Sequence, residues 1–151
     1  MKSLIGEYNC KLDDKGRFLM PAGLRKQLPE DEQTEFVINR GLDECLVLYP
    51  ISVWEKELER IQSRNQYLKK NRAFTRMFLN GATNITLDGN ARVNIPKRLQ
   101  EHAKLSKEIV LVAQIDKVEI WDQETFDSWM DEPGFDFDSL AEEVMGGGDE
   151  E

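Results

Sequence analysis

The residues best suited to chemistry in this sequence are two Asp-x-x-x-Arg motifs, "DDKGR" at 13–17 and "DGNAR" at 88–92. In each motif a carboxylate stands four residues before a guanidinium, and a proline follows four residues after the arginine. A guanidinium presents a planar fork of donors that suits a phosphate or a guanine. At a turn, the carboxylate can accept backbone N–H bonds and hold the arginine in one orientation. The motifs therefore indicate recognition of an anionic partner that carries bases.

The two motifs do not offer the same groups. The candidate nucleic-acid-binding residues of the two loops, which can approach a phosphate or a guanine, are Asp13, Lys15, Gly16, Arg17, Asp88 and Arg92. The first loop has two cations and a glycine that lets the backbone approach a phosphate closely, whereas the second has Asn90 and Ala91 at the matching positions. We therefore expect the first loop to read DNA and the second to hold an assembly together. The alternative for both loops is a structural salt bridge that only locks the turn.

Catalysis and metal binding have little support. Paired Asp loops could form an aspartic-protease dyad, but such loops continue with Thr or Ser and then Gly, and an arginine near each Asp would keep it ionised. The single histidine, His102, and two cysteines without Cys-x-x-Cys spacing, Cys10 and Cys45, are too few for a zinc site or a nucleophile with its base. We expect no enzyme, no cofactor, no metal and no small-molecule substrate, with both thiols free and buried.

The motifs lie within an internal repeat with an offset of 75 residues. Six residues recur in register: Asn9, Leu12, Asp13, Arg17, Pro21 and Leu24 match Asn84, Leu87, Asp88, Arg92, Pro96 and Leu99. Alternating apolar residues on both sides of each turn predict a hairpin, the proline then begins a short helix, and two further strands follow. One such ββαββ unit buries too little to be stable alone. We expect two units to share a core with pseudo-twofold symmetry, as one α+β barrel.

The rest of the chain surrounds these two copies. The expected layout is a first repeat at 5–52, connecting helices at 53–80, a second repeat at 81–124, and C-terminal helices with an acidic tail at 125–151. The connecting helices carry an apolar stripe that we expect to pack on the barrel: Trp54, Leu58, Ile61, Leu68, Phe74, Met77 and Phe78.

Charge is distributed unevenly. The net charge is -9, yet residues 131–151 contain nine acids and no base, so the remaining chain is balanced. Residues 60–87 contain six bases and no acid, a stretch that could face an anionic partner or simply be a solvated helix face. The N-terminus has no signal-peptide pattern, and no apolar run approaches the roughly 18 residues of a membrane span. We expect a cytoplasmic protein.

The tandem motifs, each with its following proline, together with "EIVLVAQIDKVEIWD" at 108–122, closely resemble the MraZ family of bacterial transcriptional regulators. The resemblance covers roughly residues 1–130. It implies a SpoVT-AbrB-like barrel of the swapped-hairpin type and a ring of identical subunits. It also implies nucleoid association and control of the division and cell-wall gene cluster through promoter direct repeats. The alternative is an antitoxin-type regulator or a protein-interaction scaffold on the same barrel, with the acidic tail as its contact.

Overall fold

The computed structural model describes residues 3–146, so the last five residues of the expected acidic tail, 147–151, lie outside the described residues. The first copy consists of β1 (Glu7–Lys11), β2 (Arg17–Leu19), α1 (Ala22–Arg25), β3 (Glu35–Arg40) and β4 (Leu46–Pro50), with a short 3-10 turn at Glu30–Glu32. The second copy consists of β5 (Thr83–Thr86), β6 (Arg92–Asn94), α4 (Lys97–His102), β7 (Glu108–Gln114) and β8 (Lys117–Asp122). The structure therefore has the expected ββαββ order in both copies.

The two copies are joined by exchanging strands. A six-stranded antiparallel sheet has the order β1-β7-β8-β4-β3-β5, and a separate two-stranded ribbon pairs β2 with β6. Exchanging the copies turns this strand order into itself, because β1 corresponds to β5, β7 to β3 and β8 to β4. Both outer strands of the sheet lie against a strand of the other copy. Neither copy has a complete sheet of its own, which explains why the two share one core.

The α+β class with a mainly antiparallel sheet is confirmed, and no closed barrel is found among the described residues. Within residues 3–146 the strands form one open sheet and one ribbon. The chain reverses at the turn where the Asp13 N–H donates to the Arg17 carbonyl (2.8 Å). One residue before this turn, the Leu12 N–H donates to the Lys107 carbonyl of the second copy (2.8 Å). β1 therefore pairs with β7, and β2 pairs with β6, so the expected hairpin ladder between β1 and β2 does not form.

The core lies where the six-stranded sheet meets the ribbon, α1 and α4. Its largest fully buried side chains include Phe18, Phe36, Leu24, Ile38, Leu99, Ile109, Leu111 and Ile120. Pro21 and Pro96 immediately precede the two short helices, and each helix directs one leucine, Leu24 or Leu99, into this core. The helices thereby close one side of the core and keep the ribbon against it.

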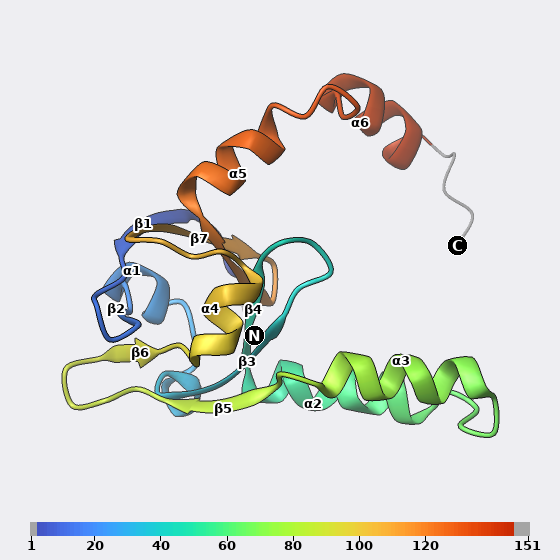
Figure 1. Ribbon diagram of the computed structural model, residues 1–151, viewed down its shortest axis with the longest axis horizontal. Coiled ribbons are helices and arrows are strands. Elements are labelled where there is room, and N and C mark those ends of the chain that lie inside the picture. The colour runs from blue at the N-terminus through green and yellow to red at the C-terminus, as the bar shows by residue number, and fades with distance from the viewer. Residues whose placement is uncertain (1–2, 147–151) are drawn as a thin grey trace.

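Two helical extensions leave this body (Figure 1). α2 (Ile51–Gln62) and α3 (Lys69–Leu79) form a protruding hairpin, in which Trp54 stacks on Phe78 with ring centroids 5.8 Å apart. The expectation that the whole apolar stripe packs on the barrel is wrong, because α3 contains no buried residue. α2 packs on β3 and β4 near its start, whereas α3 contacts α2 through Phe78 and Trp54. α5 (Gln123–Met130) and α6 (Phe137–Met145) form a C-terminal arm. None of the helices within residues 3–146 is long and apolar enough to cross a membrane.

Candidate nucleic-acid interface

In the first loop, both carboxylate oxygens of Asp13 accept hydrogen bonds, and one of them holds the arginine side chain. Asp13 Oδ1 accepts the backbone N–H groups of Lys15 and Arg17, both at 2.9 Å, and Oδ2 accepts Arg17 Nε at 2.9 Å. The Gly16 N–H donates to the Asp13 carbonyl at 3.0 Å and closes the turn. Asp13 therefore organises the loop and holds the Arg17 guanidinium by its Nε–H group.

The second loop repeats this geometry. Asp88 Oδ1 accepts the N–H groups of Asn90 (2.8 Å) and Arg92 (3.0 Å), and Oδ2 accepts Arg92 Nε at 2.9 Å. Ala91 has φ +60°, close to the +80° of Gly16 at the equivalent position. The alanine therefore adopts the left-handed conformation, and the second turn has the same backbone as the first although it lacks the glycine.

Both carboxylates are held in their ionised form. The pKa values of Asp13 and Asp88 lie below the ordinary value, chiefly because each carboxylate accepts the backbone N–H of its arginine, with the guanidinium adding to the effect. Since Nε is the atom that bonds to the aspartate, the two Nη groups remain available on each arginine. Among the described residues, no hydrogen bond occupies those Nη groups of Arg17 or Arg92.

Gly16 lies against the other copy of the repeat. It is buried, its carbonyl accepts the Ile95 N–H at 2.8 Å, and a Cβ at this position would overlap the side-chain amide of Gln100. At the equivalent position, the Ala91 carbonyl accepts the Met20 N–H at 2.9 Å. The backbone of Gly16 therefore lies close to Ile95 and Gln100 of the second copy, and this contact within the chain is what favours a glycine here.

The ribbon brings the two arginines together on one surface. β2 and β6 pair antiparallel, with Arg17 opposite Asn94, Phe18 opposite Val93, and Leu19 opposite Arg92. Directly opposite residues share a face and neighbours along a strand alternate, so Phe18 and Val93 form the inner face. Both of these are almost fully buried. The outer face consists of Arg17, Leu19, Arg92 and Asn94, and strand geometry places the Cα atoms of its two arginines about 8 Å apart.

Four residues near this face were not singled out from the sequence. Leu19 is 61% exposed and Asn94 is also exposed, both on the outer face. Arg25 and Lys26 border a hollow of about 410 Å³ beside the ribbon, which Leu19 and Ala91 also line. For Leu19 and Asn94 the only signal was the internal repeat, which makes β2 and β6 equivalent strands. Arg25 and Lys26 lie at the end of α1, and no motif in the sequence marked them. Lys15 is exposed at the tip of the first loop, as expected.

The remaining reactive side chains lie apart from the ribbon. Both cysteines are free, as expected; Cys45 is buried and Cys10 half-buried, and burial raises their pKa values to about 12 and about 11. His102 lies at the C-terminal end of α4, and its Nε2 is buried without a partner among the described residues. The described part of the chain contains no group of three or more potential metal-binding side chains.

Comparison with known proteins agrees with the tandem organisation. A family model described as "MraZ protein, putative antitoxin-like" matches twice, over residues 4–77 and 78–145. The chain belongs to the MraZ family. Each match contains one Asp-x-x-x-Arg loop and one ββαββ unit, so the internal repeat and the resemblance seen in the sequence are both confirmed.

Several MraZ relatives match nearly from end to end, and all three described here are named "Transcriptional regulator MraZ". The protein from Christiangramia forsetii is 43% identical over 150 residues, covering 99% of this chain and 97% of the relative. The Flavobacterium psychrophilum protein is 41% identical over 147 residues, with coverages of 97% and 94%. The Natranaerobius thermophilus protein is 37% identical over 141 residues, with coverages of 93% and 96%. The relatives are regulators, so the family confirms the expectation of a non-enzymatic protein.

Proposed function

We propose that this protein is a sequence-specific, DNA-binding transcriptional regulator and that the outer face of the β2–β6 ribbon reads the DNA. The observation that carries the proposal is the ribbon's arrangement. Arg17 and Arg92 lie on one outward face, each held by its own aspartate and each with its Nη groups available. The names of the MraZ relatives, which are transcriptional regulators, support the same conclusion.

The chemistry of this face suits the major groove of B-DNA, which is wide enough to admit a two-stranded ribbon. An arginine fork can bind the O6 and N7 acceptors of guanine, an asparagine can bind adenine, and an apolar side chain can contact the methyl group of thymine. The ribbon offers two arginines, Asn94 and Leu19 for these contacts. Lys15 at the loop tip, with Arg25 and Lys26 beside the ribbon, would contact phosphates and position the protein without reading bases.

We propose further that the target is a set of direct repeats in the promoter of the bacterial division and cell-wall gene cluster, read by a ring of identical subunits in the cytoplasm and on the nucleoid. These points follow from the MraZ resemblance. The exchange of β2, β6 and the two outer strands between copies supports the assignment to the swapped-hairpin SpoVT-AbrB type in an open form. One ribbon carries few cations, so several ribbons acting together would be needed for strong binding.

An antitoxin-type regulator is the second candidate, and the antitoxin-like description of the family favours it. In that case the acidic C-terminal arm would contact a partner protein, while the ribbon could still bind DNA. The two candidates differ in their main ligand, which is promoter DNA for the first and a partner protein for the second.

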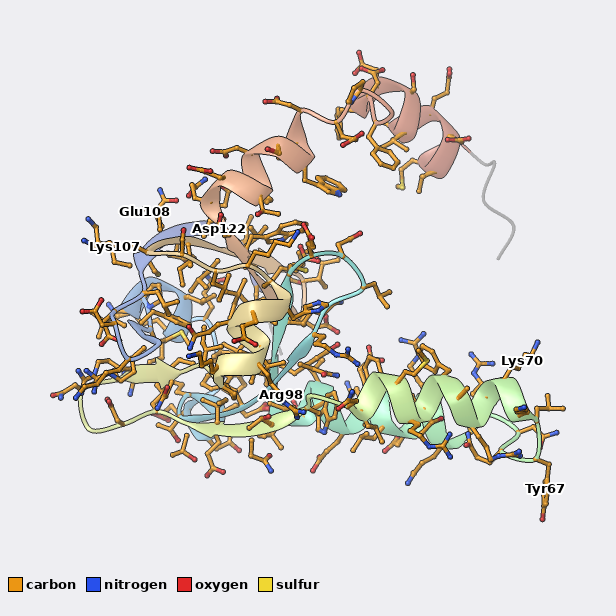
Figure 2. All side chains as sticks on the ribbon, viewed as in Figure 1. Tyr67, Lys70, Arg98, Lys107, Glu108 and Asp122 are labelled. Carbon is orange, nitrogen blue, oxygen red and sulfur yellow. The ribbon has the colours of Figure 1, made fainter. Side chains whose placement is uncertain are left out.

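An electrophoretic shift assay on the DNA upstream of the protein's own gene tests the main proposal. We expect a discrete complex that an excess of scrambled DNA does not displace. Arg17→Ala and Arg92→Ala should each weaken this complex at least about tenfold, since each removes a guanine-reading fork. This proposal replaces the expected division of labour between the two loops, because both arginines lie on the same face of the ribbon. Tyr67→Ala is the matched control, because Tyr67 lies at the far tip of the α2–α3 hairpin (Figure 2). Equal affinity for scrambled DNA would reject sequence-specific recognition.

A further inference from the structure

The two ends of the β2–β6 ribbon are equivalent in backbone but differ in their side chains. One end lies beside the first loop and α4, where the Gly16 carbonyl accepts the Ile95 N–H. The other end lies beside the second loop and α1, where the Ala91 carbonyl accepts the Met20 N–H. We call them the α4 end and the α1 end. Residues 75 positions apart in the sequence occupy equivalent places at the two ends, so they can be compared pair by pair.

The outer face of the ribbon is symmetric in its arginines and asymmetric beside them. Arg17 and Arg92 are equivalent, and each is held by its own aspartate. At the α1 end the other outer side chain is Leu19, whereas the equivalent side chain at the α4 end is Asn94, and both are exposed. An asparagine can make two hydrogen bonds to adenine, but an apolar side chain can only contact the methyl group of thymine. The two ends therefore favour different base pairs.

The α1 end has a positively charged hollow. Its volume is about 410 Å³, and Leu19, Arg25 and Lys26 are among its lining residues. None of the described residues that line it is an acid. Arg25 is half-buried, and within the described chain no ion pair occupies its guanidinium. Because Leu19 belongs to the outer face of the ribbon, the hollow adjoins the surface proposed to read DNA.

At the α4 end, a neutral side chain packs against the loop instead. Gln100 is equivalent to Arg25, and its Nε2 donates to the Ile95 carbonyl at 2.8 Å. Its amide lies so close to Gly16 that a Cβ on the glycine would overlap it. The side chain at this position is therefore tied to the protein backbone at the α4 end, whereas its charged equivalent at the α1 end borders an open hollow.

The charges of the two helices differ in the same direction. Glu101 is equivalent to Lys26 and is exposed. The α4 end has a cation of its own in Lys97, but Glu101 follows it by four residues in the helix, and residues at that spacing lie on the same face. The acid therefore offsets the attraction of Lys97 for a phosphate. An acid stands at the α4 end where the α1 end has a cation.

We propose that the hollow at the α1 end binds one backbone phosphate of the DNA, that the α4 end has no equivalent phosphate site, and that the protein therefore reads each site in one direction. Arg25 and Lys26 hold the phosphate. Leu19 contacts a thymine methyl group, and Asn94 reads an adenine at the other end. In the reversed orientation, Glu101 faces the phosphate and repels it, so the wrong orientation is disfavoured by charge as well as by the bases. This inference rests on the proposed DNA recognition and adds its direction.

Selection of DNA by the full-length protein tests the reading direction. The probe is a pool of duplexes with one random window of about 12 base pairs, slightly more than one helical turn. We expect the enriched site to be non-palindromic, with a guanine on each strand for the two arginines and unlike base pairs beside them. An enriched palindrome would overturn the inference alone. If no sequence is enriched, the proposed recognition is rejected and the inference falls with it.

One substitution should make the selected site symmetric. Leu19→Asn gives the ribbon an asparagine at both equivalent positions, so the enriched site should become palindromic at the base pairs that the ribbon reads. Leu42→Asn is the matched control, since Leu42 is 93% exposed in the loop between β3 and β4, well away from the ribbon in Figure 1. Circular dichroism establishes folding, and Asn94→Leu replaces Leu19→Asn if the latter does not fold. A folded variant that selects the original site would contradict the inference.

Neutralising single phosphates tests the hollow. The probe is the enriched site with one uncharged methylphosphonate, placed in turn at each position of both strands. We expect one position to lower the affinity about tenfold, and the position related to it by the symmetry of the ribbon to lower it less than about twofold. Arg25→Gln, which copies the side chain of the α4 end, should weaken binding to the unmodified site and remove the difference between the two positions. Equal losses at both positions, or a difference that persists in folded Arg25→Gln, would overturn the phosphate site.

Discussion

At the scale of single residues, the orientation of each ribbon arginine depends on the aspartate of its own turn, which accepts three hydrogen bonds. Asp13 and Asp88 each accept two backbone N–H groups and one Nε–H group. In the proposed DNA complex, this arrangement would fix the guanidinium before binding and so lower the entropy lost on binding. The carboxylate charge would repel phosphate less, because the Asp already accepts hydrogen bonds from its own loop and its arginine.

The pH response of the loops follows from the lowered pKa values of Asp13 and Asp88. A carboxyl whose pKa is lowered in the folded state stabilises the fold above its unfolded pKa, about 3.9 for an Asp, and loses that contribution as the pH falls through the folded value. We expect both loops to keep their geometry from pH 8 to 5 and to lose it only below about pH 3.9. Carboxyl ¹³C NMR titration measures this directly. Titration of Asp13 at or above its ordinary pKa in the unchanged protein would contradict the hydrogen bonding described here.

Gly16 and Ala91 should differ in their tolerance of substitution, although their backbones agree. Gly16→Ala should lower the free energy of unfolding by about 1 to 3 kcal/mol, because φ is +80° and the new Cβ meets Gln100. Ala91→Gly should change it by less than about 1 kcal/mol, since relieved backbone strain offsets the added freedom of the unfolded chain. Urea unfolding of the pair measures both. Equal destabilisation by both substitutions would show that Gln100 does not restrict position 16.

At the scale of elements, the ribbon combines the two loops into one surface that neither copy has alone. β2 and β6 are only three residues long, and their inner residues Phe18 and Val93 anchor them in the core. The outer residues are then free for recognition, because the side chains of a strand alternate between faces. A short ribbon backed by a packed core holds such residues more rigidly than a loop does.

Two substitutions at and beside the ribbon should distinguish base contacts from phosphate contacts. Asn94→Ala should relax selectivity at one A·T pair, by about 1 to 3 kcal/mol, because its amide can make two bonds to adenine. Lys26→Ala should weaken specific and scrambled DNA alike and reduce the salt slope by about 0.9, as expected for one lost phosphate contact. Competition titrations with base-substituted repeats at several salt concentrations measure both effects. Loss of selectivity in Lys26→Ala, with Asn94→Ala unchanged, would reverse these assignments.

At the scale of the whole molecule, affinity should come from many ribbons rather than one. Residues 1–130 carry balanced charge, so the long-range attraction of one subunit for DNA is weak. In an assembly, the first contact raises the effective concentration of the others.

We therefore expect a DNA with several direct repeats to bind about 100-fold more tightly than a DNA with one, provided the repeat spacing matches the assembly. Fluorescence anisotropy at one fixed salt concentration measures the ratio. A DNA with the same number of repeats at an altered spacing is the control, since it should lose the advantage of several repeats. The same affinity for one repeat and for several would exclude multivalent binding.

The sequence by itself determined the features that arise from residues close together in the chain. The repeat, the Asp-x-x-x-Arg turns, the prolines before α1 and α4, and the order of strands and helices all depend on interactions within a few residues. Such interactions leave recognisable spacings in one sequence. The family resemblance rests on the same local motifs, so it too was available before the structure.

Only the tertiary structure decided which distant segments meet. It paired β2 with β6 and thereby placed Arg17 and Arg92 on one face, buried Gly16 beneath Gln100, and left Phe74 exposed on a protruding hairpin. Backbone hydrogen bonds between strands are chemically alike, so the sequence of a strand does not specify its partner. Likewise, an apolar helix stripe indicates that a face needs covering, but whether its own chain or another copy covers it depends on where the fold places that helix.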